Sequence, residues 1–150
     1  EEDIALLDEG LINQISQISK IDKTGPEAAR DVLYIEDNPA NLKFMEKVFE
    51  REIACDLVTA SDGLKGLEMV KKLQPALVLL DINLPGMNGL EILQHLKNDP
   101  ETQKIPVLMV SANAMSESIS KAMDSGAAGY LTKPIEVEKL KASVGSLVHC

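Results

Sequence analysis

The chain has 150 residues, 45% of them hydrophobic and 26% charged, a composition typical of one globular domain. Its net charge of −9 and its lack of a Lys/Arg cluster argue against direct nucleic-acid binding. No apolar run approaches the roughly 18 residues of a membrane span, and the acidic start is unlike a signal peptide, so we expect a cytoplasmic protein without membrane contact.

Residues 1–30 differ from the rest of the chain and predict a helical extension or linker. Their apolar residues follow a helical spacing, at Ile4, Leu7, Leu11, Ile15 and Ile18. Gly25-Pro26 ends this pattern. Three roles stay open for the segment: a helix docked on the domain, a dimerising or linking helix that would allow a homodimer, or the tail of a larger protein.

From residue 31 onward, five segments with strand character alternate with five helical segments. The strand segments are rich in aliphatic residues and lie at 32–35, 55–60, 76–81, 105–111 and 130–132. The second of these alternates apolar and polar residues, so we expect it near an edge of the sheet.

The helical segments begin and end at recognisable residues. Asn38 is a predicted N-cap, and Pro39 is a favourable first helical residue. Ser61-Asp62 can cap the second helix, which Pro75 prevents from continuing. The other three helices are expected at about 90–98, 115–125 and 135–147.

This alternation predicts an α/β fold in which helices cover both faces of a five-stranded parallel sheet. The flavodoxin-like (βα)5 order 2-1-3-4-5 would place the first and third strands side by side. We adopt that order by analogy, because spacing alone does not determine it. The acidic ends of these two strands, Glu36-Asp37 and Asp81, would then share one crevice.

Three carboxylates at one sheet edge would repel one another, and a divalent cation would relieve that repulsion. Glu36, Asp37 and Asp81 offer a few hard oxygen ligands, which suit Mg²⁺ better than Ca²⁺. The sequence has no Cys/His cluster to suggest zinc. The alternative interpretation is that these acids are loop residues and helix caps that never meet.

A carboxylate such as Asp81 can act as a nucleophile, and protein carboxylates do form aspartyl phosphates. Phosphoryl transfer mainly requires positioning and neutralisation of the phosphoryl oxygens, which Lys133 and the hydroxyl of Ser111 can provide. Taken singly, Asp81 and Ser111 are explained as turn or cap residues, and Lys133 as a solvated lysine. Their common position at strand ends favours a shared site.

These signals, in this order, resemble the receiver domain of two-component response regulators. The match consists of four motifs, at Glu36-Asp37-Asn38, 80–89 around Asp81, Ser111-Ala112 and 129–134. Each motif alone is weak, whereas the four at matching strand ends are specific. The resemblance divides the chain into an extension at 1–30 and a receiver domain at 31–150.

The resemblance implies that Asp81 accepts a phosphoryl group from a phosphohistidine on a sensor histidine kinase or a histidine phosphotransfer protein. It also implies that Asp37, Asp81 and the backbone carbonyl of Asn83 bind Mg²⁺, with Glu36 acting through water.

The same resemblance implies a switch. Lys133 would contact the phosphoryl group, Ser111 would move toward it, and Tyr130 would change rotamer as Ser111 vacates its space. The surface around the last strand would then present a different face to partners. The alternative for Tyr130 is a half-buried aromatic residue on a short strand.

The run from Glu36 to Asn41 resembles receivers attached to hybrid histidine kinases. Because the chain ends directly after the last helix, we expect a stand-alone receiver or one cut from a larger protein. Whether the chain counts as an enzyme stays open, since a receiver catalyses its own phosphorylation and dephosphorylation, and a hybrid-kinase receiver is part of a kinase.

Three alternative functions remain. A receiver that binds partners without phosphorylation would need a broken site, and this one is intact by sequence. A Mg²⁺-dependent phosphatase of the haloacid dehalogenase type would place a second Asp two residues after Asp81, where this chain has Asn83. A flavin or nucleotide binder would need a Gly- or Ser/Thr-rich phosphate loop at Glu36-Asp37.

Neither the two cysteines nor the histidine that follows Asp81 adds to the predicted chemistry. Cys55 and Cys150 lie far apart, which indicates no disulfide framework and fits a reducing cytoplasm. His95 lies on a predicted helix of an α/β domain, whereas phosphodonor histidines belong to helical bundles. We therefore expect His95 to be an exposed surface residue.

Overall fold

The computed structural model describes residues 31–150, so the helix predicted at 1–30 lies outside the described residues. Within the described part, five parallel strands form one sheet in the predicted order β2-β1-β3-β4-β5. The strands are β1 (Asp31–Ile35), β2 (Asp56–Ala60), β3 (Leu77–Asp81), β4 (Val107–Ser111) and β5 (Gly129–Thr132).

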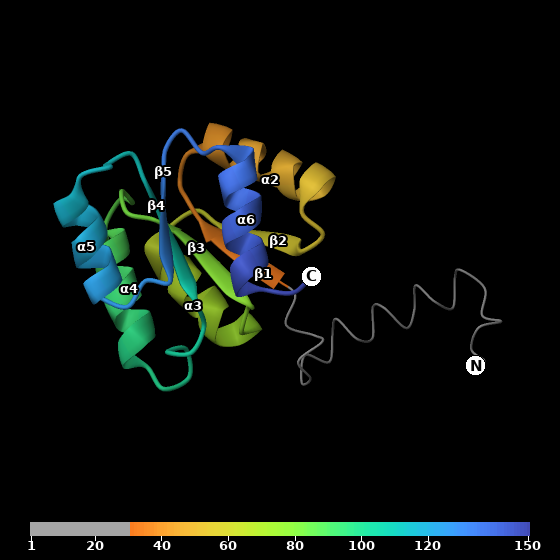
Figure 1. The fold of residues 1–150 in the computed structure, drawn as a ribbon. Coiled ribbons are helices and arrows are strands. Elements are labelled where there is room, and N and C mark those ends of the chain that lie inside the picture. The colour runs from red at the N-terminus through yellow and green to blue at the C-terminus, as the bar shows by residue number, and fades with distance from the viewer. Residues whose placement is uncertain (1–30) are drawn as a thin grey trace, which may run out of the picture.

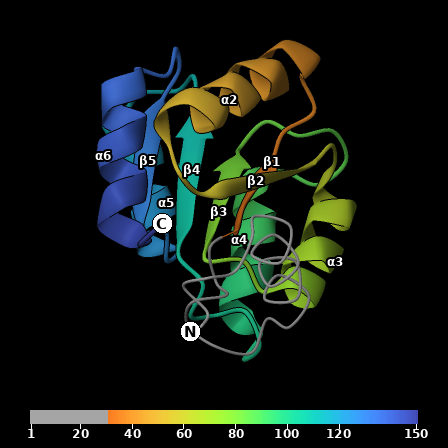
Figure 2. The same ribbon diagram turned by 90° about the vertical axis from the view of Figure 1, so that its right-hand side faces the viewer.

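Helices alternate with the strands and cover both faces of the sheet (Figures 1 and 2). They are α2 (Pro39–Glu52), α3 (Gly63–Leu73), α4 (Gly89–Asn98), α5 (Ser116–Asp124) and α6 (Val137–Leu147). α2 and α6 pack on one face, and α3, α4 and α5 on the other. None of the helices in residues 31–150 is long and apolar enough to span a bilayer.

Each face of the sheet has its own apolar core, because alternate residues of a strand point to opposite faces. Leu33 and Ile35 of β1 pack toward α3, α4 and α5, whereas Val32 and Tyr34 pack toward α2 and α6. β1, β3 and β4 are buried along their whole length, and β2 is only partly buried at its edge, as its alternation predicted. The adjacency of β1 and β3 brings their carboxyl ends together in the middle of the sheet.

The predicted caps of α2 and α3 are present. Asn38 Oδ1 accepts hydrogen bonds from the backbone N–H groups of Ala40 at 2.8 Å and Asn41 at 3.2 Å. Asp62 Oδ1 accepts one from the backbone N–H of Lys65 at 2.8 Å. The polar residues after β1 and β2 therefore satisfy N–H groups that have no partner within the helix.

Some predicted ends are shifted by one or two residues. β2 begins at Asp56, β4 at Val107 and α6 at Val137, rather than at 55, 105 and 135. Pro106 precedes β4 and has no N–H to donate to a sheet. Ile135 packs against the core beside α6 although it precedes the helix, so its apolar character reflects burial rather than helical structure.

Cys55 and Cys150 form a disulfide, so the expectation of no disulfide was wrong. Their Cα atoms lie 5.0 Å apart although 95 residues separate them in sequence. Cys55 precedes β2 and Cys150 follows α6, and the sequence pattern does not reveal that these two ends of elements meet. The disulfide ties the end of the chain to the edge of the sheet.

Reduction of this disulfide should lower the free energy of unfolding by about 2–4 kcal/mol, because it releases a long closed loop in the unfolded chain. Denaturant unfolding with and without dithiothreitol measures the change. Cys150→Ser should show the lower stability in both buffers. An unchanged midpoint on reduction would show that the disulfide does not stabilise the domain.

Candidate functional site

Glu36 directly follows β1 and is buried, with 1% of its surface exposed. Its Oε1 accepts hydrogen bonds from Tyr34 Oη at 3.0 Å, Asn41 Nδ2 at 2.9 Å and Lys133 Nζ at 3.1 Å. Its Oε2 accepts from the backbone N–H groups of Asp37 at 3.0 Å and Asn38 at 3.2 Å. These donors stabilise the ionised carboxylate although burial opposes ionisation.

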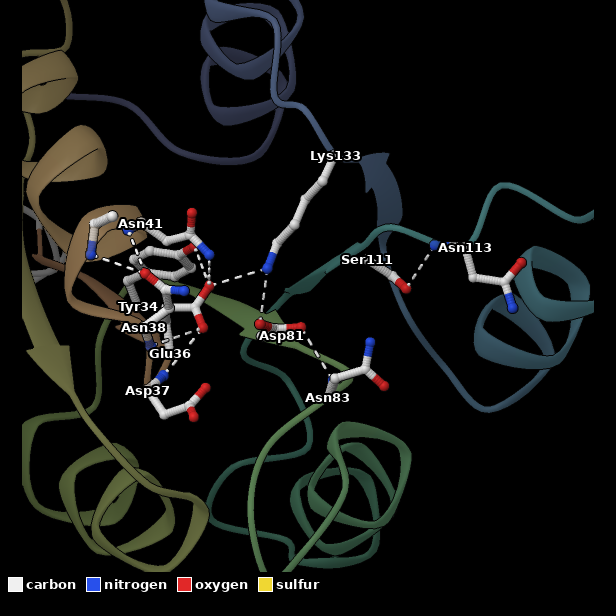
Figure 3. A network of polar contacts seen from close by, with 11 residues as sticks. Tyr34, Glu36, Asp37, Asn38, Asn41, Asp81, Asn83, Ser111, Asn113 and Lys133 are labelled. Carbon is white, nitrogen blue, oxygen red and sulfur yellow. Dashed lines mark hydrogen bonds and ion pairs between the residues drawn. The ribbon is translucent and has the colours of Figure 1, made fainter.

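Asp81 is the last residue of β3 and is also buried, with 2% of its surface exposed. Its Oδ1 accepts a hydrogen bond from the backbone N–H of Asn83 at 3.0 Å, and its Oδ2 accepts one from Lys133 Nζ at 2.9 Å. Lys133 follows β5 and points inward to form ion pairs with both Asp81 and Glu36 (Figure 3). One ammonium group therefore joins the ends of β1, β3 and β5.

The pKa values of the two buried carboxylates are shifted in opposite directions. Burial raises the pKa of Glu36, but hydrogen bonding with Asp81, Lys133 and the start of α2 outweighs it and lowers the pKa to about 2. Burial also raises the pKa of Asp81; Lys133 opposes this effect, Glu36 adds to it, and the net pKa lies above the ordinary 3.8. Burial lowers the pKa of Lys133, but its two carboxylate partners outweigh burial and raise it. The contacts of Glu36 thus outweigh the cost of burying its charge, whereas those of Asp81 do not.

Glu36, Asp37 and Asp81 have carboxylate oxygens within 4.8 Å of one another. Asp37 is exposed, and no hydrogen bond or ion pair to its carboxylate is formed within residues 31–150. Three carboxylates beside Lys133 leave an excess of negative charge, and hard oxygen donors of this kind fit Mg²⁺. Asp37 and Asp81 have oxygens available for a cation, whereas those of Glu36 already accept five hydrogen bonds.

Ser111 ends β4 and is buried, and its Oγ accepts a hydrogen bond from the backbone N–H of Asn113 at 3.1 Å. Its hydroxyl therefore faces the loop after β4 rather than Asp81 (Figure 3). Tyr130 on β5 is half-buried, and its hydroxyl donates to the backbone carbonyl of Asn113 at 2.7 Å. Both predicted switch residues thus bind the backbone of Asn113.

The family model of the response regulator receiver domain matches residues 32–145 of the chain. This chain belongs to the receiver domain family. The receiver is 38% identical over 118 residues to the DNA-binding dual master transcriptional regulator RpaA of Synechocystis, with 79% of this chain and 48% of RpaA covered. It therefore spans about half the length of RpaA. The DNA binding named for RpaA is said of that protein and not of this chain.

Two further relatives are matched over nearly their whole length. The polar-differentiation response regulator DivK of Brucella anthropi is 32% identical over 117 residues, which cover 78% of this chain and 94% of DivK. The receiver domain of Francisella response regulator 1452 has a solved structure with a TM-score of 0.73 and 26% identity, covering 79% of this chain and 95% of that one.

The receiver structure brings Glu36, Asp37, Asp81 and Lys133 together at the carboxyl end of the sheet. Asn83 lies beside them with its side chain exposed and its backbone N–H bound to Asp81. Ser111 and Tyr130 are held by the neighbouring loop, and no hydrogen bond within residues 31–150 joins either to Asp81. His95 is exposed on α4, as predicted.

Sequence reasoning did not identify Tyr34, Asn41 or Asn113 as parts of this network. Two of them carry signals that were available. Tyr34 lies two residues before Glu36, and residues at that spacing face the same side of a strand. Asn41 is the third residue of α2, a position from which a side chain can reach back past the N-cap. No comparable signal marks Asn113, because its backbone makes the contacts.

Gly89 explains part of the motif that follows Asp81. A Cβ atom at this position would clash with the backbone of Asp81 and Ile82, and the Gly89 N–H donates to the Ile82 carbonyl at 2.8 Å. α4 therefore begins directly against the end of β3, where no side chain fits. Asn88 caps this helix with a capping box, which fixes the loop around Asp81.

Asp81→Asn should stabilise the receiver in metal-free buffer at neutral pH, on the order of 1–2 kcal/mol, because it removes a poorly compensated buried charge. Since the pKa of Asp81 is raised in the fold, its ionisation destabilises the parent as pH rises above the ordinary value of 3.8. The advantage of the variant should therefore be largest at neutral pH and shrink toward about pH 4.

Urea unfolding with a chelator at several pH values measures this difference. A parent that is more stable than Asp81→Asn at neutral pH would show that the ion pair with Lys133 outweighs the repulsion among the carboxylates.

Proposed function

We propose that this receiver accepts a phosphoryl group from a phosphohistidine onto Asp81, with Mg²⁺ present, and switches conformation for a protein partner. The observation that carries the proposal is the buried Asp81 carboxylate, 2.9 Å from Lys133 and within 4.8 Å of two further carboxylate groups. The donor would be a sensor histidine kinase or a histidine phosphotransfer protein, and membership in the receiver family supports this class of partner.

The residues of the site have distinct proposed tasks. The carboxylate of Asp81 forms the new P–O bond as the P–N bond to the donor histidine breaks. The Lys133 ammonium, already at hydrogen-bond distance, neutralises charge on the phosphoryl oxygens without a large movement. Asp37, Asp81 and the backbone carbonyl of Asn83 would hold Mg²⁺, with Glu36 acting through water, and the bound ion would supply further positive charge to those oxygens.

The proposed switch starts at Ser111. Its hydroxyl would leave the N–H of Asn113 and bind an oxygen of the phosphoryl group on Asp81. Tyr130 would then change rotamer, because its hydroxyl is bound to the carbonyl of the same Asn113. The altered surface would comprise α5, β5 and α6.

The alternatives have less support. Asn83 carries an amide where a haloacid dehalogenase-type phosphatase needs a general acid. A receiver that acts without phosphate has no need for the ion pairs of Lys133 with two buried carboxylates. A hybrid-kinase origin and a cytoplasmic location stay predictions, and the Cys55–Cys150 disulfide removes the cysteine usage as a ground for the location.

A small phosphodonor plus Mg²⁺ should add one phosphoryl group to the chain, because a receiver that positions its own reacting groups needs no kinase for the chemistry. Intact mass detects the adduct. Asp81→Asn should remain unmodified, whereas Asp124→Asn, a matched change on the exposed end of α5, should be modified like the parent. Modification of Asp81→Asn to the parent level would show that Asp81 is not the acceptor.

Mg²⁺ alone should also stabilise the parent domain, by about 2.7 kcal/mol at a concentration one hundred times its Kd. Thermal unfolding across a MgCl2 series measures this effect. Asp37→Asn should lose most of it, because Asp37 offers the exposed carboxylate of the cluster. Equal stabilisation of the parent and of Asp37→Asn would place Mg²⁺ elsewhere on the molecule.

A further inference from the structure

The Cys55–Cys150 disulfide is a reactive group that no step of the proposed phosphoryl transfer uses. Thiolates attack disulfides, and the sulfur that is easier to reach is attacked first. Cys55 is buried, with 6% of its surface exposed, whereas Cys150 is exposed. An external thiolate therefore reaches the sulfur of Cys150 more easily than that of Cys55.

The contacts near Cys150 allow it to react while the domain stays folded. Val148 is buried in the core formed with α2 and α6, and its N–H donates to the Val144 carbonyl at 2.9 Å. His149 and Cys150 follow it and are exposed, and no hydrogen bond or ion pair within residues 31–150 holds either of them. Cleavage of the S–S bond therefore frees the end of the chain from the edge of the sheet and leaves the packing of α6 in place.

The surface beside the disulfide is acidic. A groove of about 410 Å³ next to Cys55 is lined by Glu46, Glu50 and Asp56, and none of the described residues that line it is basic. Glu46 and Glu50 are exposed on α2 and form no ion pair within residues 31–150. Their charges attract a cationic thiol and repel an anionic one.

We propose that Cys55–Cys150 is a thiol–disulfide exchange site that reacts in the folded state and prefers small cationic aminothiols. The aminothiol thiolate attacks Cys150 Sγ, the S–S bond breaks, and Cys55 Sγ leaves with the electron pair and takes a proton from water. A second aminothiol thiolate attacks the sulfur of the first, and Cys150 leaves as a thiolate that water protonates. The protein disulfide thus gains two electrons, and two aminothiols are oxidised to one small disulfide.

The acidic groove affects the leaving group as well as the approach of the thiol. Burial and the neighbouring carboxylates both oppose negative charge on the sulfur of Cys55. Cys55 is therefore a poor leaving group when the attacking thiol is neutral or anionic. An aminothiol joined to Cys150 brings its ammonium group close to the leaving sulfur, where it stabilises the developing charge.

Reduction of the folded full chain by cysteamine or by 2-mercaptoethanesulfonate at low ionic strength tests this inference. Each rate is expressed per thiolate and divided by the rate for a neutral reference disulfide, 2-hydroxyethyl disulfide, which removes the intrinsic reactivity of the thiol. The ratio of the two normalised rates should favour cysteamine by about tenfold and should fall toward one in about 1 M NaCl. Peptide mass mapping after acid quenching should place the first adduct on Cys150.

Glu46→Gln/Glu50→Gln should lower this ratio by about threefold, because it removes two of the charges that line the groove. Glu117→Gln/Asp124→Asn is the matched control. It removes the same net charge from exposed positions on α5, which packs on the opposite face of the sheet, and it should leave the ratio unchanged.

Three results would overturn the inference. A reduction rate that stops rising with thiol concentration would show that the reaction requires unfolding, so the disulfide would be a structural crosslink only. A normalised ratio near one would remove the preference for cationic thiols, and a first adduct on Cys55 would contradict the proposed point of attack. None of these results depends on Asp81 or on Mg²⁺, so they leave the proposed phosphoryl transfer untouched.

Discussion

The contact on which the site depends is the Lys133 ammonium between two buried carboxylates, those of Glu36 and Asp81. Burial of two acids is costly unless each is paired and hydrogen-bonded. A single cation serves both here only because β1, β3 and β5 end at the same edge of a parallel sheet. The strand order brings those three strand ends to one edge, and the two apolar cores pack the sheet against its helices. Gly89 lets α4 begin directly against the end of β3.

The same cation leaves the two acids in unequal positions. Glu36 has four donors besides Lys133, and its pKa falls to about 2, whereas Asp81 has one further donor and a raised pKa. Carboxylates whose surroundings push their pKa values apart are suited to different tasks. A carboxylate that accepts five hydrogen bonds, as Glu36 does, holds the donor groups around it in place. Asp81 accepts only one hydrogen bond at each oxygen, so both oxygens keep lone pairs, as the proposed function requires.

Much of this arrangement follows from periodicity. Aliphatic runs and helix caps predicted the elements, whereas the strand order, adopted by analogy, predicted that Glu36-Asp37 and Asp81 would meet. Periodicity does not predict where the ends of elements that are distant in sequence lie in space. It also does not predict which rotamers their side chains adopt. For that reason it missed the Cys55–Cys150 disulfide, which joins the start of β2 to the segment after α6. It also placed Ser111 correctly on β4 without revealing that its hydroxyl faces Asn113.

The backbone of Asn113 provides a physical link between the site and the outer surface. Its N–H donates to the Ser111 hydroxyl and its carbonyl accepts from the Tyr130 hydroxyl. A movement of this one residue would therefore disturb both contacts. Under the proposed function, a hydroxyl that turns to a phosphoryl oxygen leaves that N–H without its partner, and the loop must move to satisfy it. A moved loop carries the Tyr130 acceptor with it. The proposed conformational change would therefore need no long chain of contacts, because Ser111 and Tyr130 both bind the backbone of Asn113.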